Sequence, residues 1–280
     1  MVVTDHHLPP QTLPEAAAIV NPQLPGDESP CKTLSGAGVA FKLAAALDGC
    51  TPDEMLPFYG DLAAIGTIAD IMLLEGENRR IVKAGLALLQ QTERPGIAAL
   101  IEACGLGGKE LTAENVSFGL APRLNAAGRM DSAAAALELL LCEDPEEAEA
   151  IVAGLEAQNA ARQKAEQDIL QGMLDSVAAD ETYGADRILV VWGRGYHQGV
   201  IGIVASRMVE LYNKPALVLC ADGDTLKGSG RSIASFDLHR GLTRCADVLV
   251  AYGGHRMAAG VRVEPGRLTE FRERFLSVAR

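Results

Sequence analysis

One long helical stretch constrains this chain more than any other feature. Asp144-Pro145-Glu146-Glu147 supplies a helix cap, a proline at the first helical position and two acidic residues in the first turn. From there to about Val177 the sequence has no further proline and is rich in Ala, Glu, Gln and Lys. The sequence therefore predicts two folded parts, residues 1–143 and 183–280, joined by a connector helix within residues 144–182.

The two parts differ in their patterns. Residues 1–143 are mostly helical in pattern, and Thr51-Pro52-Asp53-Glu54 is one clear helix start. In the last third, strands are expected at 187–192, 216–220 and 226–232, a turn at 222–224, and helices at 199–212, 238–250 and 268–278. The expected class is α/β, with a helix-rich first part and a smaller α/β second part.

Charge is divided unevenly between the two parts. Residues 1–186 carry 11 Lys and Arg against 29 Asp and Glu, whereas residues 187–280 carry 14 against 8. The total of -12 argues against a generally basic nucleic-acid coat. The split is typical of a cation-binding part beside a polyanion-binding part, and a chance surface bias is the alternative.

Several classes of protein are excluded. With 48% hydrophobic and 22% charged residues the chain is globular rather than disordered. No apolar run approaches the roughly 18 residues of a membrane span, and no secretory signal begins the chain. The six cysteines show no Cys-x-x-Cys spacing, which indicates reduced thiols and a cytoplasmic location without a zinc site.

Asp5-His6-His7 directly follows the β-branched run Val2-Val3-Thr4. Polar groups at the carboxyl end of a strand lie where open α/β sheets bind ligands. Imidazole binds transition metals, and an adjacent carboxylate can orient it. The alternative is an ordinary surface turn.

Gly66-Thr67-Ile68-Ala69-Asp70 ends a helical stretch with a lone carboxylate among apolar residues. A carboxylate in such surroundings needs a partner, and a metal ion would provide one. The alternative is a helix cap for residues 75–91.

In the segment from Pro122 to Asp131, two arginines and an asparagine flank a run of small residues. Small residues let a backbone approach a ligand, and Arg123, Asn125 and Arg129 could donate to phosphates or base edges. The alternative is a loop in which Asp131 caps the next helix, and the two interpretations are compatible.

Three glycine-rich segments lie in the basic part. His197 to Gly202, with Arg207 further along, places glycine before a helix start, where backbone N–H groups favour anions. Residues 228–232 and 253–260 combine glycines with donor side chains and arginine, a composition suited to phosphate. Each alone is more often a simple turn.

Together these segments resemble the DHH phosphoesterase family. The resemblance is carried, in chain order, by Asp5-His6-His7, GTIAD (66–70), PRLNAAGRM (122–130) and GGHRMAAG (253–260). GVIGIVASR (199–207) and GSGRS (228–232) narrow it to the branch of exonucleases specific for single-stranded DNA. The resemblance implies 5′→3′ degradation to 5′-mononucleotides with Mn²⁺ or Mg²⁺, in DNA repair and recombination. It implies single-stranded DNA with a 5′ end as partner, a single-strand-binding protein or helicase as further partners, and no membrane.

The resemblance also assigns roles to residues. His6 and Asp70 would bind metal, Asp5 would orient or bridge within the site, and His7 would face the scissile phosphate. Two cations about 3.5–4 Å apart would activate a water and stabilise the leaving oxygen. The implied contacts to DNA and its phosphates are Arg123, Asn125, Arg129, His197, Arg207, Ser229, Arg231, Gly253, Gly254 and His255.

The sequence departs from the family pattern at its start. The family has a D-x-D motif and a further metal-binding aspartate upstream of the DHH motif, and the D-x-D at Asp222–Asp224 falls in a turn of the other part. We therefore expect an N-terminally truncated segment with an incomplete two-metal site, one strand at Val2-Val3 and weak activity alone. Two alternatives remain: a phosphoesterase for short oligonucleotides or cyclic dinucleotides, and a catalytically dead relative that binds single-stranded DNA.

Overall fold

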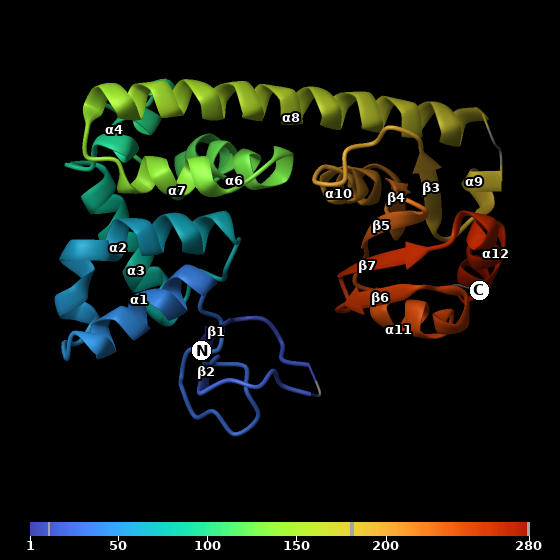
Figure 1. The fold of residues 1–280 in the computed structure, drawn as a ribbon, viewed down its shortest axis with the longest axis horizontal. Coiled ribbons are helices and arrows are strands. Elements are labelled where there is room, and N and C mark those ends of the chain that lie inside the picture. Colours follow the sequence, from blue (N-terminus) through green and yellow to red (C-terminus); the bar gives the residue numbers. More distant parts are fainter. Residues whose placement is uncertain (11, 180–181, 279–280) are drawn as a thin grey trace. The chain divides into compact units, whose positions relative to one another are not determined.

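The structure is a computed structural model that describes residues 1–10, 12–179 and 182–278 and contains two compact units (Figure 1). The first unit comprises Met1–Ala127 and Ala133–Ala157, and the second comprises Gly128–Ser132 and Gln158–Arg280. Residues 180–181 of the expected connector and 279–280 of the expected second part lie outside the described residues.

The predicted long helix is confirmed as α8 (Pro145–Ala179). Oδ1 of Asp144 accepts hydrogen bonds from the backbone N–H groups of Glu146 and Glu147, as expected of a helix cap. Its sequence is polar along most of its length. No helix in the part of the chain that the structure describes is long and apolar enough to cross a membrane.

Two short parallel strands begin the first unit. In this pair β1 (Val2–Thr4) runs beside β2 (Ala18–Val20), with Val3 opposite Ile19. The expectation of a single strand at Val2-Val3 is therefore wrong. The run Ala18-Ile19-Val20 supplies the partner, because its apolar and β-branched residues favour an extended backbone.

Helices make up most of the rest of the first unit. They are α1 (Gly36–Leu47), α2 (Pro52–Ala69), α3 (Gly76–Leu89), α4 (Pro95–Ala103), α5 (Ala113–Asn115), the π-helical turn η1 (Val116–Leu120), α6 (Ala121–Met130) and α7 (Ala134–Leu141). The predicted helix start at Thr51 is confirmed, because Thr51 and Glu54 form a reciprocal capping box.

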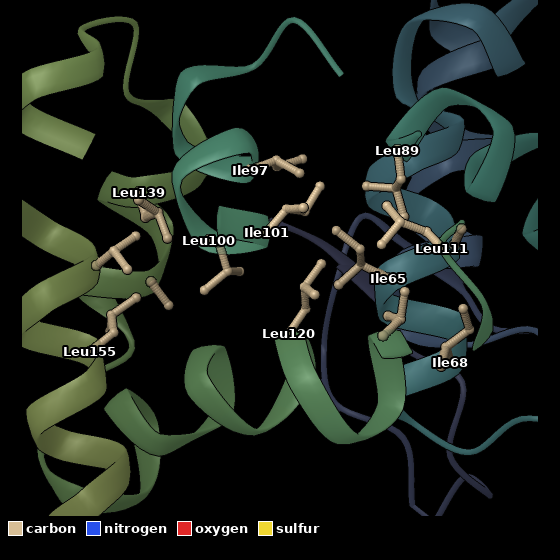
Figure 2. Close-up of a cluster of buried hydrophobic side chains, with 14 of the residues drawn as sticks. Ile65, Ile68, Leu89, Ile97, Leu100, Ile101, Leu111, Leu120, Leu139 and Leu155 are labelled. Atoms are coloured by element: carbon tan, nitrogen blue, oxygen red, sulfur yellow. The ribbon is translucent and has the colours of Figure 1, made fainter. Parts of the chain in front are cut away.

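Aliphatic side chains from α2, α3, α4, η1, α6, α7 and the first part of α8 form a hydrophobic core in the first unit (Figure 2). Ile65 of α2, Leu100 of α4, Leu120 of η1, Leu139 of α7 and Leu155 of α8 are all buried there. Burying a side chain of this size stabilises the fold by roughly 1.5–3 kcal/mol. This core therefore holds α2, whose carboxyl end carries Asp70, in a fixed position within the unit.

The expectation of a loop between Pro122 and Met130 is wrong, because the segment forms α6. Ala126 and Ala127 are buried, so the small residues pack inside the unit as a helical face. Asp131 is not a cap, since α7 begins after Ala133 without a side-chain cap.

A five-stranded mixed sheet organises the second unit. Its strands are β3 (Leu189–Gly193), β4 (Ala216–Asp222), β5 (Thr225–Arg231), β6 (Ala251–Gly254) and β7 (Ala258–Val263), in the spatial order β3-β4-β5-β7-β6. Only β3 and β4 pair in parallel; the other neighbours are antiparallel. The predicted strands and the turn at Gly223 are confirmed, and the α/β class with them.

Helices cover both faces of this sheet. On one face, α10 (Ile201–Tyr212) and the later part of α8 pack on Val191 and Val218. On the other, α11 (Leu238–Thr243) and α12 (Leu268–Val278) pack on Leu217 and Leu219. Short helical turns complete the unit: α9 (Thr182–Ala185), η2 (Ala246–Val248) and η3 (Pro265–Arg267).

The helix expected over residues 238–250 is shorter than predicted. It ends at Thr243, and a separate 3₁₀ turn follows at Ala246–Val248. Leu238, Leu242, Cys245 and Val248 are all buried, which explains the helical periodicity of the sequence. The chain must leave the helix because the Val250 N–H pairs with a carbonyl of β7 at the start of β6.

Candidate metal centre and phosphate site

The Asp5-His6-His7 segment, called the DHH loop below, follows β1 directly. The backbone N–H of Asp5 donates to the carbonyl of Val20, so the loop leaves the strand pair at a fixed place. Nδ2 of Asn21, a buried residue at the end of β2, donates to the carbonyl of His7 at 2.8 Å. Sequence analysis missed Asn21, although a polar residue after an apolar β-branched run was the available signal.

Oδ1 of Asp5 organises the DHH loop. It accepts hydrogen bonds from the backbone N–H of His6 (2.7 Å) and of His7 (3.2 Å), and from Nδ1 of His7 (2.7 Å). Partial burial raises the pKa of Asp5, but the hydrogen bonds from His7 and His6 outweigh it, so this pKa lies below its ordinary value. Because a carboxylate only accepts, the proton lies on Nδ1 of His7, and the exposed His7 ring presents Nε2 outward.

His6 lies against the end of α2. Its Nε2 is 3.4 Å from Oδ2 of Asp70, the residue that follows α2. The His6 side chain is 15% exposed and that of Asp70 is 44% exposed. Asp70 is therefore neither a buried lone carboxylate nor a cap of α3, whose N-cap is Glu75. The structure brings together the four residues that the sequence singled out, from segments more than sixty positions apart.

Close packing of α1 on α2 produces this approach. A Cβ at Gly66 would collide with Cβ of Ala37, so glycine at position 66 allows the two helices to touch. Oγ of Ser35, the N-cap of α1, and Oγ1 of Thr67 form a buried hydrogen bond of 3.1 Å. The sequence indicates Gly66 and Thr67 only as part of GTIAD, without these packing roles, and gives no signal for Ser35.

The donors present fit a divalent cation. The ligand atoms of Asp5, His6 and His7 all lie within 4.8 Å of one another. The 3.4 Å between His6 and Asp70 is longer than an ordinary hydrogen bond and close to the roughly 3 Å that separates neighbouring ligands of one octahedral cation. Imidazole together with carboxylate oxygens is a donor set that suits Mn²⁺, and Mg²⁺ accepts the oxygens.

A second site, called the Arg231 site below, lies in the second unit where α10 begins. A Cβ at Gly202 would lie 3.0 Å from Oγ of Ser229 and 3.1 Å from Nη2 of Arg231, so β5 presents both side chains to the start of α10. Nη1 of Arg231 donates to Ser229 at 3.2 Å. Nη1 of Arg129 donates to the carbonyl of Gly199 at 3.3 Å, which adds a second guanidinium.

Positive charge is concentrated at the Arg231 site. Loss of solvation lowers the pKa of Arg231, and the charge of Arg129 lowers it further. Loss of solvation also lowers the pKa of Arg129, with a further decrease from Arg162 that Glu166 partly offsets. Within residues 1–10, 12–179 and 182–278, no carboxylate oxygen lies within 4.0 Å of a guanidinium nitrogen of either Arg129 or Arg231. Two like charges at a helix N-terminus favour an anion such as phosphate.

His197 shapes the turn that begins α10. Its Nδ1 accepts a hydrogen bond from the N–H of Gly199 at 3.2 Å, and its carbonyl accepts from Val200 and Ile201. His197 therefore orients the backbone of the Arg231 site through its own hydrogen bonds.

The segment from Gly253 to Gly260 is a strand pair and not an open glycine-rich loop. Ser229, Gly260 and Gly253 stand opposite one another on β5, β7 and β6, so Gly253 lies about 10 Å from Ser229 across two strand spacings. Gly254 has φ of 133° and a Cβ there would collide with Ala258, so only glycine fits. His255 is exposed in the hairpin turn, with its N–H bonded to the carbonyl of Ala258.

The remaining candidates lie apart from these contacts. Arg123 pairs with Glu156 and donates to the carbonyl of Gly119, so its guanidinium is engaged within the first unit. Asn125 is exposed on α6. Arg207 pairs with Glu210 at 2.9 Å and with Glu166 at 3.6 Å.

Two family models match this chain. The model described as the DHH family, N-terminal domain, matches residues 1–67, and the DHHA1 domain model matches residues 185–280. The first range contains the DHH loop and the second contains Ser229, Arg231 and the GGH hairpin. The fold and its two sites thus define a protein of the DHH class.

Curated relatives and solved structures identify the family within this class. The single-stranded-DNA-specific exonuclease RecJ of Bacillus subtilis is 44% identical over 282 residues, which cover 100% of this chain and 35% of the relative. A manganese complex of RecJ from Thermus thermophilus has a TM-score of 0.86 and 37% identity over 99% of this chain and 41% of its own. An exonuclease RecJ bound to manganese has a TM-score of 0.79 and 38% identity over 99% of this chain and 68% of its own. The chain belongs to the RecJ family, and it spans between about a third and a half of the curated RecJ relatives.

Proposed function

We propose that this chain carries catalytic and DNA-binding residues of a metal-dependent exonuclease, which degrades single-stranded DNA from the 5′ end and releases 5′-mononucleotides. The observation that supports this most directly is the 3.4 Å approach of His6 to Asp70 beside the Asp5–His7 hydrogen bond. Membership of the RecJ family supports the single-stranded substrate, because the curated relatives are named for that specificity.

The residues of the proposed centre have different roles in binding metal and substrate. His6, Asp70 and Asp5 would hold Mn²⁺ or Mg²⁺. A divalent cation in such a centre polarises a phosphoryl oxygen and lowers the pKa of a bound water. Asp5 fixes the ring of His7, so that Nε2 is the atom that meets the substrate. That nitrogen accepts a hydrogen bond when neutral and donates one when protonated.

The second unit supplies the proposed grip on DNA. Ser229, Arg231 and Arg129 would bind a phosphate of the strand, the 5′ phosphate included. At Gly253 the space that a side chain would occupy is empty, with no other atom within 4 Å of the Cβ position. The sugar-phosphate backbone of the DNA could therefore lie close to the sheet there. Aromatic residues are only 4% of the chain, which suits a site that contacts phosphates more than stacked bases.

We also propose that this chain alone binds one cation per molecule and cleaves slowly. Among the described residues, the DHH loop is the one group of three or more ligating side chains close enough to share an ion, and Asp70 adjoins it. Four such donors and water complete the coordination of one cation, whereas a two-metal centre needs ligands for both. Titration with Mn²⁺ followed by electron paramagnetic resonance should give a stoichiometry near one, and a value of two would contradict this.

The function is tested by incubating the purified chain with Mn²⁺ and a 5′-phosphorylated single strand labelled at its 3′ end. We expect release of 5′-mononucleotides that is abolished in His6→Ala and retained in His239→Ala, a matched histidine beside Tyr252 in the second unit. A dinucleotide and a blunt duplex serve as competing substrates. Faster hydrolysis of the dinucleotide than of the long strand would contradict the exonuclease proposal, as would release that His6→Ala does not change.

We further propose a cytoplasmic location and, as partners, a single-strand-binding protein or a helicase that exposes 5′ ends. All six cysteines are free thiols, which suits a reducing compartment. Co-purification with single-strand-binding protein before and after nuclease treatment would distinguish direct contact from a shared DNA strand.

A further inference from the structure

A group of three arginines lies in the second unit outside the Arg231 site. Arg240 and Arg244 extend from α11 and its end, and Arg256 lies in the β6–β7 hairpin turn. Together with Ser235 and Phe236 they line a pocket of about 340 Å³, called the triple-arginine pocket below. It belongs to one compact unit and contains none of the residues assigned above to metal or phosphate.

The charges of this pocket are largely uncompensated. In the part of the chain that the structure describes, no carboxylate oxygen lies within 4.0 Å of a guanidinium nitrogen of Arg240, Arg244 or Arg256. Arg256 donates to the carbonyl of Ala234. One carboxylate, Asp237, also lines the pocket, but its Oδ1 accepts the N–H of Arg240 as the cap of α11.

The backbone connects this pocket to the Arg231 site. Ser232, which follows Arg231, donates its N–H to the carbonyl of Met257 at 2.9 Å. The N–H of Leu238 donates to the carbonyl of Arg256 at 3.0 Å. Arg231 stands opposite Ala258 in the sheet, two positions from Arg256. The hairpin turn that carries His255 and Arg256 is therefore hydrogen-bonded to the residue after Arg231 and to the first residue of α11, and the two cationic sites lie at this end of the sheet on its opposite faces.

We infer that the triple-arginine pocket binds backbone phosphates of the same single strand at a second contact beyond the Arg231 site. Guanidinium groups match the geometry of phosphate oxygens, and such contacts hold a strand without reading its sequence. The inference rests on the proposed function, since that function supplies the strand. A free phosphate or a released nucleotide offers the same chemistry, and the experiment separates these sources from the strand.

The test measures binding of a 3′-fluorescein-labelled 20-nucleotide thymidine strand by anisotropy, with EDTA present to prevent cleavage. Dissociation constants are taken between 50 and 200 mM NaCl. Each phosphate neutralised on a single strand contributes about 0.7 to the slope of log affinity against log salt. In the triple variant, Arg240, Arg244 and Arg256 are all changed to Gln. We therefore expect the magnitude of its slope to be smaller than that of the wild type by about 2. Each single variant should lower it by about 0.7.

A charge-matched control uses three other arginines of the second unit, each of which forms an ion pair with a carboxylate. The control triple variant changes Arg262, Arg267 and Arg274 to Gln, whose guanidinium groups pair with Asp222, Glu270 and Asp247. It removes the same charge, and its slope should equal that of the wild type. Equal losses in both triple variants would show a general effect of charge and would overturn the inference.

Other outcomes are equally decisive. An unchanged slope in the arginine pocket variant, while the wild type binds and cleaves the strand, overturns the inference and leaves the proposed function standing. An unchanged slope with loss of binding to thymidine 5′-monophosphate or to a poly-glutamate peptide reassigns the pocket to a free nucleotide or an acidic peptide. A lower slope in a chain that shows no Mn²⁺-dependent cleavage supports the pocket and refutes the exonuclease proposal.

Discussion

The DHH loop and the Arg231 site are assembled from the chain in different ways. His6 and Asp70 come from a strand end and a helix end, and the packing of both β1 and α2 on α1 places them 3.4 Å apart. Ser229, Arg231 and Gly260 instead stand on two adjacent strands, where the register of the sheet fixes them. The first site therefore depends on side chains remote from its chemistry, whereas the second depends mainly on backbone pairing.

The DHH loop and the Arg231 site also differ in how far their charges are compensated within the protein. At the DHH loop, carboxylates and imidazoles already contact one another, so the site is partly compensated without a ligand. At the Arg231 site, Arg129 and Arg231 repel each other, and a ligand anion relieves that repulsion. Substitutions at the first site should therefore change metal binding and rate, and those at the second should change the affinity for DNA.

The largest expected effect separates rate from affinity at the DHH loop. Asp70→Asn removes a proposed ligand, and because loss of an outer-shell partner alone typically costs 10- to 100-fold, we expect cleavage to fall by about 100-fold or more. Binding of single-stranded DNA in EDTA should stay within twofold of wild type. Asp48→Asn is the matched control, since Asp48 ends α1 as Asp70 ends α2. Equal rates in the two variants would remove Asp70 from the centre.

Arg231→Gln should show the converse pattern. Hydrogen bonds to charged groups contribute about 1.5–3 kcal/mol, so the affinity for single-stranded DNA should fall roughly 10- to 100-fold. The Mn²⁺ affinity, measured by isothermal titration, should not change. Arg262→Gln removes an arginine that pairs with Asp222 at 2.7 Å on the same sheet and should bind DNA normally. A loss of Mn²⁺ binding in Arg231→Gln would contradict the separation of the two sites.

Gly66→Ala tests whether the packing of α1 on α2 determines the geometry of the proposed metal centre. The added methyl group would collide with Ala37, and overpacking of this kind costs about 1–3 kcal/mol of unfolding free energy. Weaker Mn²⁺ binding should accompany the loss, as α1 and α2 move apart. Gly154→Ala on α8 meets no atom within 4 Å and should stabilise the chain by about 0.5–1 kcal/mol. Denaturant unfolding of both variants gives the comparison, and wild-type stability in Gly66→Ala would refute the role of this contact.

The smallest expected effect concerns Asn21. Asn21→Ala removes the hydrogen bond that Nδ2 donates to the carbonyl of His7 and the one that Oδ1 accepts from the N–H of Gln23, each of which contributes about 0.5–1.5 kcal/mol. We expect the Mn²⁺ affinity to fall between twofold and tenfold, with DNA binding unchanged. An unchanged Mn²⁺ affinity would show that the DHH loop keeps its shape without these contacts.

Local patterns predicted β3, β4 and β5 of the second unit and missed β6 and β7, whose glycine-rich sequence was interpreted only as a phosphate-binding segment. Buried apolar runs gave the strands near 189, 216 and 226, because side-chain period and turn residues are encoded within a few positions. The helix beyond Thr243 was overestimated, since the same buried period continues through Cys245 and Val248 while the backbone already turns to the sheet edge. Periodicity reports which side chains are buried and does not report where the backbone hydrogen bonds go.

The sequence indicated the side chains of the proposed metal centre and did not indicate the residues that support them. Asp5, His6, His7 and Asp70 were identified because polar groups at the ends of apolar runs stand out in a sequence. Ser35 and Asn21 were missed, because a hydrogen bond between distant segments leaves no spacing in the sequence. The small residues of α6 were misjudged for a related reason: alanines beside a ligand and alanines inside a helix bundle have the same composition.

The two carboxylate oxygens of Asp5 differ in their hydrogen bonding. Oδ1 accepts three hydrogen bonds that shape the DHH loop, whereas within the described residues Oδ2 has no recorded partner. An amide is isosteric with a carboxylate and can still accept through one oxygen, but it presents an NH₂ group in place of the other. Asp5→Asn would therefore keep the shape of the loop and lose the negative atom. That single substitution would therefore separate the proposed metal-binding role of Asp5 from its role in shaping the DHH loop.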